Sequence, residues 1–428
     1  MKALIIADDF TGANDAGVQF AKKQLTTSVL MHENVSLSKH IEVLVTDTDS
    51  RSSQRHVAYQ KVQSALKLAK QYEFDTIYKK IDSTMRGNVG SELDALLDNS
   101  DAKFIIIAPS YPDNHRFVKN GHIFVEDTPL EETYFARDVS TPIHSSSIKA
   151  LIEHSSNRLA DMITLEDLYL DKEAFHKKLA LLRENGVEFM ICDAETNAHL
   201  KTLFQYMNHY AEPFIWCGSA GMAEQLADHL ATEKVSDLAK EGRRDERILL
   251  AVGSVHERTR DQLEHLLAHS NIKGIELNTT SLLHSKELKQ QTLHQAYKEA
   301  IRLLQEHANI VLYTSAAPED IQSSREIGKK RNLSSVQVSD YISSSIGELV
   351  RMIIEDISIE RALFTGGDTA KKVAEHIESN QFHLLDEVEE GIPIGILTGK
   401  YNILTVTKAG GFGKIDSLLR SYYVLGGA

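Results

Sequence analysis

Residues 3–17 read ALIIADDFTGANDAG, so a short apolar run passes directly into a polar, glycine-containing segment. The apolar residues 3–7 are typical of a buried strand, and two aspartates, Asp8 and Asp9, end the run. The residues after them suit the start of a helix, because an aspartate there can accept a hydrogen bond from a free backbone N–H group. This order predicts the strand, loop and helix from which a parallel α/β sheet is built.

Similar apolar runs recur along the chain and alternate with amphipathic stretches such as residues 57–71, whose apolar residues have helical spacing. Strands that alternate with helices predict an α/β fold, in which mostly parallel sheets are flanked by helices on both faces. The expected strands are 3–7, 43–46, 76–78, 104–108, 189–192, 214–216, 248–252, 310–313, 362–364 and 403–406.

A charged segment, residues 233–247 (EKVSDLAKEGRRDER), separates two such series and is nearly free of large apolar side chains. Because 428 residues suit two or three domains, we expect an N-terminal domain at residues 1–240 and a C-terminal domain at residues 245–428. One continuous sheet is the alternative, which this length disfavours. Residues 117–147 are less regular, and we interpret them as a β-rich flap over the sheet.

The overall charge and the cysteine content disfavour several classes of partner. The formal net charge is -14, which argues against binding of nucleic acid or an anionic membrane through the bulk field. Cys192 and Cys217 each lie in or beside an apolar run, so we expect buried free thiols and a reducing compartment. We see neither a signal peptide nor an apolar run long enough to cross a membrane. A cytoplasmic protein without a nucleic-acid or membrane partner is therefore expected.

Polar, hydroxyl-rich segments follow each of the first four predicted strands. The carboxyl ends of these strands would form a crevice at one edge of a parallel sheet. These segments are 8–15, 47–51, 79–88 and 109–116. Each has an ordinary explanation, since aspartates cap helices and charged loops are often merely solvated. Together they bring acids, hydroxyls and cations to one edge, which favours a site for a small polyhydroxylated anion. His115 and Arg116 are weaker candidates than Lys80, Asp82 and Arg86.

In the C-terminal half, the strands end in glycine and hydroxyl residues. The segments are GSVH (253–256), TGGDTA (365–370) and TKAGGFG (407–413). Glycines let backbone N–H groups approach phosphate oxygens, so these loops favour a nucleotide phosphate cradle over simple tight turns. The Walker glycine loop and the dinucleotide fingerprint G-x-G-x-x-G after an early strand are both missing, which disfavours P-loop enzymes and Rossmann dehydrogenases.

The stretches ADDFTGANDAG, KKIDSTMRGNVGSEL, APSYPDNHR, TGGDTA and KAGGFG, in this order, closely resemble the four-carbon acid sugar kinase family. The resemblance extends from Met1 to Ser417. It implies a substrate domain followed by an ATP domain, an active site in the cleft between them, and phosphoryl transfer to the C4 hydroxyl of the acid. The opening segment and Asp368 look most like the branch acting on D-threonate, with D-erythronate and 3-oxo-tetronates as alternatives.

The resemblance also implies site residues, carried over motif by motif. An acid-sugar site would be lined by Asp8, Asp9, Thr11, Asp15, Arg51, Lys80, Asp82, Ser83, Thr84 and Arg86. An ATP site would be lined by Ser254, Gly366, Gly367, Asp368, Thr369, Lys408, Gly410, Gly411 and Gly413. Met85, where leucine is usual, and His115, where glycine is frequent before the arginine, depart from the family pattern.

Within these sets we expect three catalytic candidates, Asp8, Asp9 and Asp82, and the sequence does not choose the general base among them. Arg86 and Lys80 should hold the substrate carboxylate. Mg²⁺ is expected between the ATP phosphates, with an aspartate contributing directly or through water.

Two other functions fit an α/β fold with an anionic ligand. An NAD-dependent sugar-acid dehydrogenase is disfavoured by the missing glycine fingerprint. A non-catalytic sugar-acid sensor is disfavoured because both the acid cluster and the glycine loops are present. A homodimer is the expected assembly.

Overall fold

The computed structural model describes residues 1–31, 37, 40–137, 141–231 and 247–427. The chain divides into an N-terminal unit, residues 1–29 and 37–234, and a C-terminal unit, residues 30–36 and 235–428. The boundary that we predicted at 233–247 lies, apart from Arg247, outside the described residues. None of the helices that the structure describes is both long and apolar enough to span a membrane.

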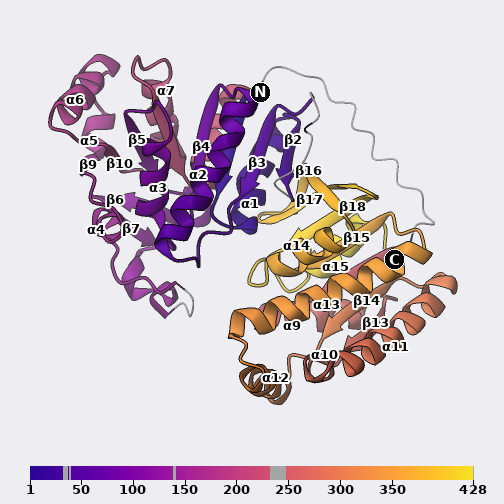
Figure 1. Cartoon of the computed structure of the whole chain (residues 1–428). Coiled ribbons are helices and arrows are strands. Elements are labelled where there is room, and N and C mark those ends of the chain that lie inside the picture. The colour runs from indigo at the N-terminus through magenta and orange to yellow at the C-terminus, as the bar shows by residue number, and fades with distance from the viewer. Residues whose placement is uncertain (32–36, 38–39, 138–140, 232–246, 428) are drawn as a thin grey trace. The chain divides into compact units, whose positions relative to one another are not determined.

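The N-terminal unit (indigo to magenta in Figure 1) is built on a sheet of strand order β2-β3-β1-β4-β11-β5-β10-β9. All neighbours from β3 to β9 are parallel. The strands are β1 (Ala3–Ala7), β2 (Thr27–Leu30), β3 (Val43–Asp47), β4 (Thr76–Lys80), β5 (Phe104–Ala108), β9 (Ala160–Ile163), β10 (Phe189–Cys192) and β11 (Phe214–Gly218).

Helices lie in two groups on this sheet. In the first group α2 packs on α3 and α3 on α4, and in the second α1 packs on α8 and α8 on α7. Right-handed crossovers place the first group on one face and the second on the other. The helices are α1 (Phe10–Lys22), α2 (Arg55–Tyr72), α3 (Val89–Asp98), α4 (Ile148–Glu153), α5 (Leu165–Leu168), α6 (Lys172–Glu184), α7 (Asn197–Met207) and α8 (Ala220–Leu230).

The chain leaves the neighbouring strands β1 and β4 in opposite directions. After β1 it passes through α1 to β2 and β3, and after β4 it passes through α3 to β5, on the other side. In an open α/β sheet, such a reversal leaves a crevice at the carboxyl ends of the two strands. The segments that begin at Asp8 and Ile81 lie at this crevice.

The C-terminal unit (orange to yellow in Figure 1) has the strand order β13-β14-β12-β15-β18-β17-β16. Strands β12 to β15 and β18 are parallel, whereas β16, β17 and β18 form an antiparallel meander. The strands are β12 (Ile248–Val252), β13 (Lys273–Leu277), β14 (Ile310–Thr314), β15 (Arg361–Thr365), β16 (Ser379–Glu389), β17 (Ile392–Gly399) and β18 (Asn402–Lys408).

A second reversal lies between β12 and β15. The chain leaves β12 through α9 toward β13, and leaves β15 through α14 toward the meander on the other side. The glycine-containing segments that follow these two strands therefore border the crevice of this sheet. The helices are α9 (Glu257–His269), α10 (Thr279–His284), α11 (Lys286–Gln305), α12 (Pro318–Lys330), α13 (Ser335–Asp356), α14 (Gly367–His376) and α15 (Ser417–Val424).

The α/β architecture with mostly parallel sheets and flanking helices is confirmed, and a strand lies at each of the ten predicted positions. The sequence did not reveal β2, β9, β13, β16 and β17. Strands β2 and β9 are short, β13 and β16 carry many polar residues, and β17 is interrupted by Pro393 and Gly395. The segment 117–147 contains most of a three-stranded antiparallel sheet of β6 (Arg116–Lys119), β7 (His122–Val125) and β8 (Thr128–Pro129), as the flap prediction required.

Buried aromatic and sulfur side chains fill the interior of the N-terminal unit. Trp216, in β11, is the single tryptophan of the chain and stacks on Phe204 at 5.4 Å between ring centroids. Cys192 and Cys217 are free and buried, as predicted. Burial raises the pKa of Cys217 to about 12, so this thiol stays protonated and inert at neutral pH.

Helix α15 closes the core of the C-terminal unit through Tyr422, which is fully buried beside Leu418 and Leu425. The Tyr422 hydroxyl accepts a hydrogen bond from Asn309 Nδ2 (2.8 Å) and donates one to Asn271 Oδ1 (3.0 Å). Asn309 in turn accepts from the backbone N–H of Ile248, at the start of β12. One hydroxyl thus connects the last helix to the first strand of this sheet.

We expect Tyr422→Phe to lower the free energy of unfolding by about 1 kcal/mol, because Asn309 and Asn271 lose their common partner while the ring stays packed. Urea titration followed by circular dichroism measures the change. Tyr423→Phe is the matched control, since the neighbouring tyrosine is 46% exposed, and its effect should stay within about 0.5 kcal/mol. Equal effects of the two substitutions would contradict the role given to Tyr422.

Candidate active site

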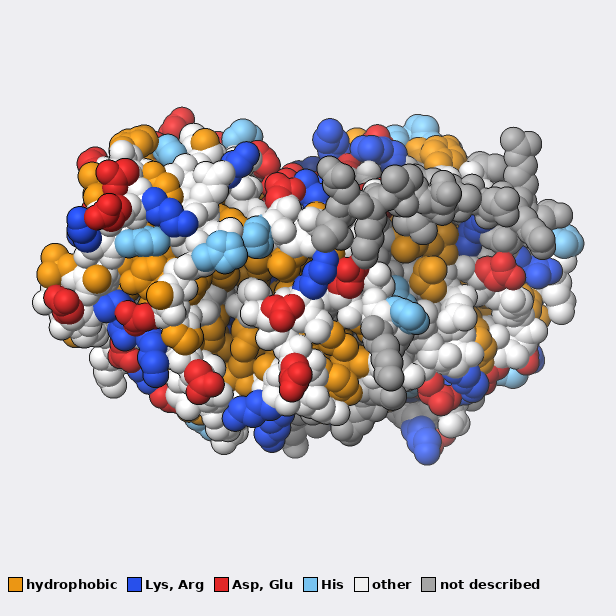
Figure 2. Space-filling model, turned by 90° about the horizontal axis from the view of Figure 1, so that it is seen from above, with side chains coloured by type: hydrophobic (Ala, Val, Ile, Leu, Met, Phe, Trp, Pro, Cys, Tyr) orange, Lys and Arg blue, Asp and Glu red, His pale blue; other side chains and the backbone are white. Residues whose placement is uncertain are grey.

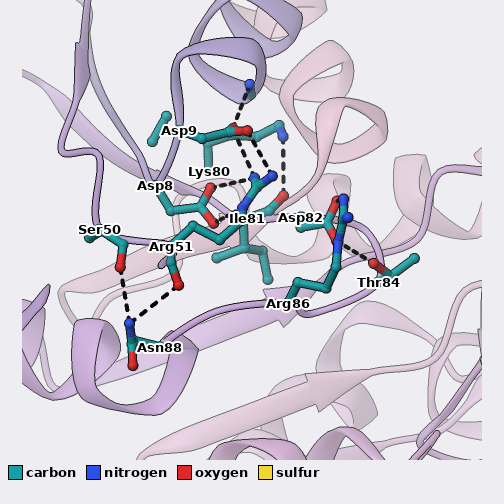
Figure 3. A network of polar contacts seen from close by, with 12 residues as sticks. Asp8, Asp9, Ser50, Arg51, Lys80, Ile81, Asp82, Thr84, Arg86 and Asn88 are labelled. Atoms are coloured by element: carbon teal, nitrogen blue, oxygen red, sulfur yellow. Dashed lines mark hydrogen bonds and ion pairs between the residues drawn. The ribbon is translucent and has the colours of Figure 1, made fainter. Parts of the chain in front are cut away.

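Arg51 joins the loop after β3 to the loop after β1 (Figure 3). Its Nε lies 2.7 Å from Asp8 Oδ2 and its Nη2 lies 2.9 Å from Asp8 Oδ1. Nη1 and Nη2 lie 2.7 and 2.8 Å from the two carboxylate oxygens of Asp9. All three guanidinium nitrogens therefore contact carboxylates of the protein itself.

The charge of Arg51 keeps Asp8 ionised in a buried position. Burial by itself would raise the pKa of Asp8, but the ion pair with Arg51, helped by Lys79 and Lys80, lowers the pKa below its ordinary value. The pKa of Arg51 is raised well above its ordinary value: burial opposes this, and the charges of Asp8 and Asp9 outweigh burial. The crevice thus carries fixed charges at neutral pH.

Helix α1 starts directly behind this pair. Asp9 is its N-cap, and its side chain accepts a hydrogen bond of 2.7 Å from the backbone N–H of Gly12. Asp9 therefore has the helix-capping role that is ordinary for an aspartate at this position, and it also contacts Arg51. Lys80 Nζ lies 3.7 Å from Asp15 Oδ2, on the same helix, and Thr11 is partly exposed beside them.

The segment after β4 forms a second carboxylate–arginine pair (Figure 3). Arg86 donates from Nε to Asp82 Oδ2 (2.7 Å) and from Nη2 to Asp82 Oδ1 (3.2 Å), and Thr84 also donates to this carboxylate. Burial would raise the pKa of Asp82, but Arg86 and Arg51 lower it far below its ordinary value. The expectation that Arg86 and Lys80 hold the substrate carboxylate stays a prediction, because both contact carboxylates of the protein.

Arg116, a weak candidate from the sequence, reaches the same group of residues. Its Nη1 donates to Ser83 Oγ at 2.7 Å. His115, just before it, has φ +51°, a left-handed conformation that glycine adopts more readily than histidine. The backbone at His115 therefore has a conformation that suits glycine, the residue that is frequent at this position in the family pattern. Arg116 follows directly and is the first residue of β6.

Beneath these loops lies a buried network that sequence reasoning missed. Lys79 Nζ and Glu92 Oε2 lie 2.7 Å apart, with side chains 0% and 1% exposed. Ser50 Oγ donates to the other oxygen of Glu92 at 2.7 Å, and Asn88 Nδ2 donates to the Ser50 carbonyl at 3.0 Å. This network fixes the backbone next to Arg51. The only sequence signal was the pair Lys79-Lys80, whose side chains must point to opposite faces of a strand.

In the C-terminal unit, the segments after β12, β15 and β18 meet around Gly366. This glycine has φ +93°, which disfavours a side chain, and its N–H donates to the carbonyl of Lys408 at 2.8 Å. A Cβ built on Gly366 would lie 3.3 Å from Thr369 Oγ1 and 3.8 Å from the backbone nitrogen of Ser254. Helix α14 starts at Gly367, with Asp368 exposed in its first turn.

Lys408 and the loop behind it are held by α9. Thr259 Oγ1 donates to the carbonyl of Gly410 at 2.6 Å, and Lys408 Nζ donates to the carbonyls of Ala409 (2.8 Å) and Gly410 (3.2 Å). Burial lowers the pKa of Lys408 to about 8, because the nearest charges compensate little. A buried ammonium at the end of a strand, where glycines let the backbone segments approach closely, fits an anionic phosphate group.

The two predicted sets of residues are thus each gathered within one unit. Ser254, Gly366, Thr369, Lys408 and Gly410 surround one point, and Gly411 and Gly413 continue the same loop. The placing of the active site in a cleft between the domains stays a prediction.

On the face that Figure 2 shows, Lys and Arg side chains alternate with Asp and Glu, and neither charge gathers into one broad patch.

Comparisons with known proteins agree with this division. A family model described as a sugar-binding N-terminal domain matches residues 3–226, and one described as a nucleotide-binding C-terminal domain matches residues 249–418. A D-threonate kinase of Salmonella typhimurium is 30% identical over 428 residues, which cover 99% of this chain and 98% of the relative. The chain belongs to the four-carbon acid sugar kinase family.

Further acid sugar kinases match nearly the whole chain. A D-erythronate kinase of Heliobacterium modesticaldum is 26% identical, and the match covers 97% of this chain and 94% of the relative. A 3-oxo-tetronate kinase of Pseudomonas savastanoi is 23% identical, and the match covers 99% of this chain and 97% of the relative. A solved Haemophilus influenzae protein has the same fold, with a TM-score of 0.78 at 22% identity. The match covers 99% of this chain and 100% of that protein's chain.

The buried ion pair of this acid sugar kinase gives a test of the site's support. Lys79→Met should lower the free energy of unfolding by about 3–5 kcal/mol, because it leaves the Glu92 carboxylate buried without its cation. Adding Glu92→Gln should restore much of this loss, since glutamine is neutral and still accepts from Ser50. Chemical unfolding of the three proteins measures both changes.

Lys177→Met is the control, because Lys177 pairs with Glu173 on an exposed helix face and should contribute less than about 1 kcal/mol. If the double variant were no more stable than Lys79→Met, the two charges would not be acting as a pair.

Proposed function

We propose that the protein is an ATP-dependent kinase that phosphorylates the C4 hydroxyl of a four-carbon sugar acid, with D-threonate as the first choice of substrate. The observation that supports this most is the group of ionised aspartates and cations at the reversal between β1 and β4. D-erythronate and 3-oxo-tetronates are the alternative substrates, because relatives named for all three acids are 23–30% identical to this chain.

Phosphoryl transfer requires in-line positioning, neutralisation of charge and a group that accepts the hydroxyl proton. Asp8, Asp9 and Asp82 remain the candidates for the last role. The side chain of Asp9 is 26% exposed, against 3% for Asp8 and 11% for Asp82, so Asp9 is the most accessible of the three. Arg51 would keep Asp8 ionised and hold the carboxylates of Asp8 and Asp9 in place.

The ATP phosphates would lie at the segments after β12, β15 and β18, where Gly366 and Gly410 bring the backbone close to Thr369 and Ser254 and where Lys408 supplies a positive charge. Magnesium would come with the nucleotide and neutralise phosphate charge, as is usual for kinases. Asp368, exposed in the first turn of α14, is our candidate for a contact with it. The homodimer and the cytoplasmic location stay predictions.

The proposal predicts release of ADP when the protein is mixed with ATP, Mg²⁺ and a four-carbon sugar acid. A coupled assay over D-threonate, D-erythronate and 3-oxo-tetronates should show turnover that EDTA abolishes, with the highest kcat/KM for D-threonate. Five- and six-carbon sugar acids serve as controls for the size of the site. Absence of turnover on every four-carbon acid, with ATP still bound in calorimetry, would contradict the assignment.

The lowered pKa of Lys408 predicts how nucleotide affinity depends on pH. A bound phosphate favours the charged lysine, so ATP should bind well below pH 8 and weaken by up to about tenfold per pH unit above it. Calorimetric titration with ATP across this range measures the effect. Lys408→Arg should bind ATP independently of pH, because arginine stays charged, and Lys408→Met should bind weakly throughout. Wild-type affinity that does not change across pH 8 would rule out contact between Lys408 and the phosphates.

A further inference from the structure

Arg116 differs from the other cations around the crevice of the N-terminal unit. Arg51 contacts Asp8 and Asp9, Lys80 lies near Asp15, and Arg86 contacts Asp82. Within the described residues, Arg116 contacts no carboxylate: its side chain donates to Ser83 Oγ, and its Nε is buried without a hydrogen-bond partner. A partly buried guanidinium in this state has donors available for an anion.

The flap holds Arg116 in a fixed position. Its backbone exchanges hydrogen bonds with Tyr111 (2.8 and 3.1 Å) and pairs with Val125 in β7. The ring of Phe135, which is 4% exposed, lies 5.4 Å from the Arg116 guanidinium carbon and 5.2 Å from that of Arg86. Both guanidinium groups thus contact the same ring, and each interacts favourably with its face.

We propose that Arg116 binds the carboxylate of the sugar acid and that Phe135, which belongs to the flap, is a positioning residue that orients Arg116 beside Arg86. This inference rests on the proposed kinase function and deepens it. Arg86 is already neutralised by Asp82, so its contribution is to the local field, whereas Arg116 contacts no carboxylate of the described residues and its Nε has no hydrogen-bond partner.

The bound anion could be the planar carboxylate of the acid or a tetrahedral phosphate of ATP, and the position of Arg116 favours the carboxylate. Arg116 contacts Ser83, in the segment after β4, where the acid-sugar motifs gather. The test below separates the two sources, because a carboxylate contact changes the KM for the acid and a phosphate contact changes the KM for ATP.

The decisive variant is Arg116→Gln, assayed with the sugar acid and with the corresponding amide, in which a neutral group replaces the carboxylate. We expect the KM for the acid to rise about 30-fold or more, as when one partner of a buried charge pair is removed. The KM for ATP and the kcat/KM for the amide should change less than about twofold, so the preference for acid over amide collapses. Arg116→Lys should be intermediate, because an ammonium lacks the planar fork.

Phe135→Leu should raise the KM for the acid about three- to tenfold and leave the KM for ATP unchanged, because Arg116 loses its orientation but keeps its charge. Phe135→Tyr, which keeps the ring, should restore the wild-type KM. Phe124→Leu is the matched control, since Phe124 lies in the same flap and stacks on Phe117. Arg183→Gln controls for loss of an arginine over a ring, because Arg183 packs on Phe104 at the amino end of β5.

An unchanged preference for acid over amide in Arg116→Gln would overturn the proposal, and so would a rise in the KM for ATP alone. If the wild-type protein phosphorylates none of the acids, the proposed function fails separately. Calorimetric binding of D-threonate to the wild type and to Arg116→Gln then decides the role of Arg116 without turnover: weaker binding by the variant supports it, and equal or absent binding overturns it.

Discussion

The guanidinium of Arg51, held between Asp8 and Asp9, is the interaction on which the crevice of the N-terminal unit depends. Burial by itself would raise the pKa of Asp8, and the cation between the two adjacent carboxylates outweighs this effect. Because Arg51 comes from the loop after β3, its contacts also join two strand ends that follow different connections. Lys79 and Glu92 support it from below, through Ser50 and Asn88.

The two units share a topological device but differ in the residues that it brings together. In each, neighbouring parallel strands send the chain in opposite directions, and the predicted site segments lie where it divides. At the end of β1 and β4 the crevice is lined by side-chain charges, which suit a small acid with several hydroxyl groups. At the end of β12 and β15 it is lined by glycine and backbone, which suit the oxygens of a phosphate chain. The two predicted sites thus differ in the residues that line them and not in topology.

Sequence reasoning located this fold because buried parallel strands are apolar runs and their polar ends stand out. It missed β16, SNQFHLLDEVE, because a strand of a meander with a partly exposed face carries mixed residues. It named Lys80 and overlooked Lys79, since the sequence does not show which of two adjacent lysines pairs with Glu92, and the structure buries both. It also gave Arg86 to the substrate without foreseeing the bond to Asp82, because a pairing four residues apart depends on the turn between them.

The position of Trp216 has a spectroscopic consequence. This indole lies in β11, paired with β4, and the sequence has no second tryptophan. Light absorbed selectively by indole therefore excites a single site, deep in the acid-sugar unit and two residues from the strand end that precedes Ser219. Emission from the intact protein is a built-in optical signal of that sheet alone, with no label attached and no contribution from the nucleotide unit.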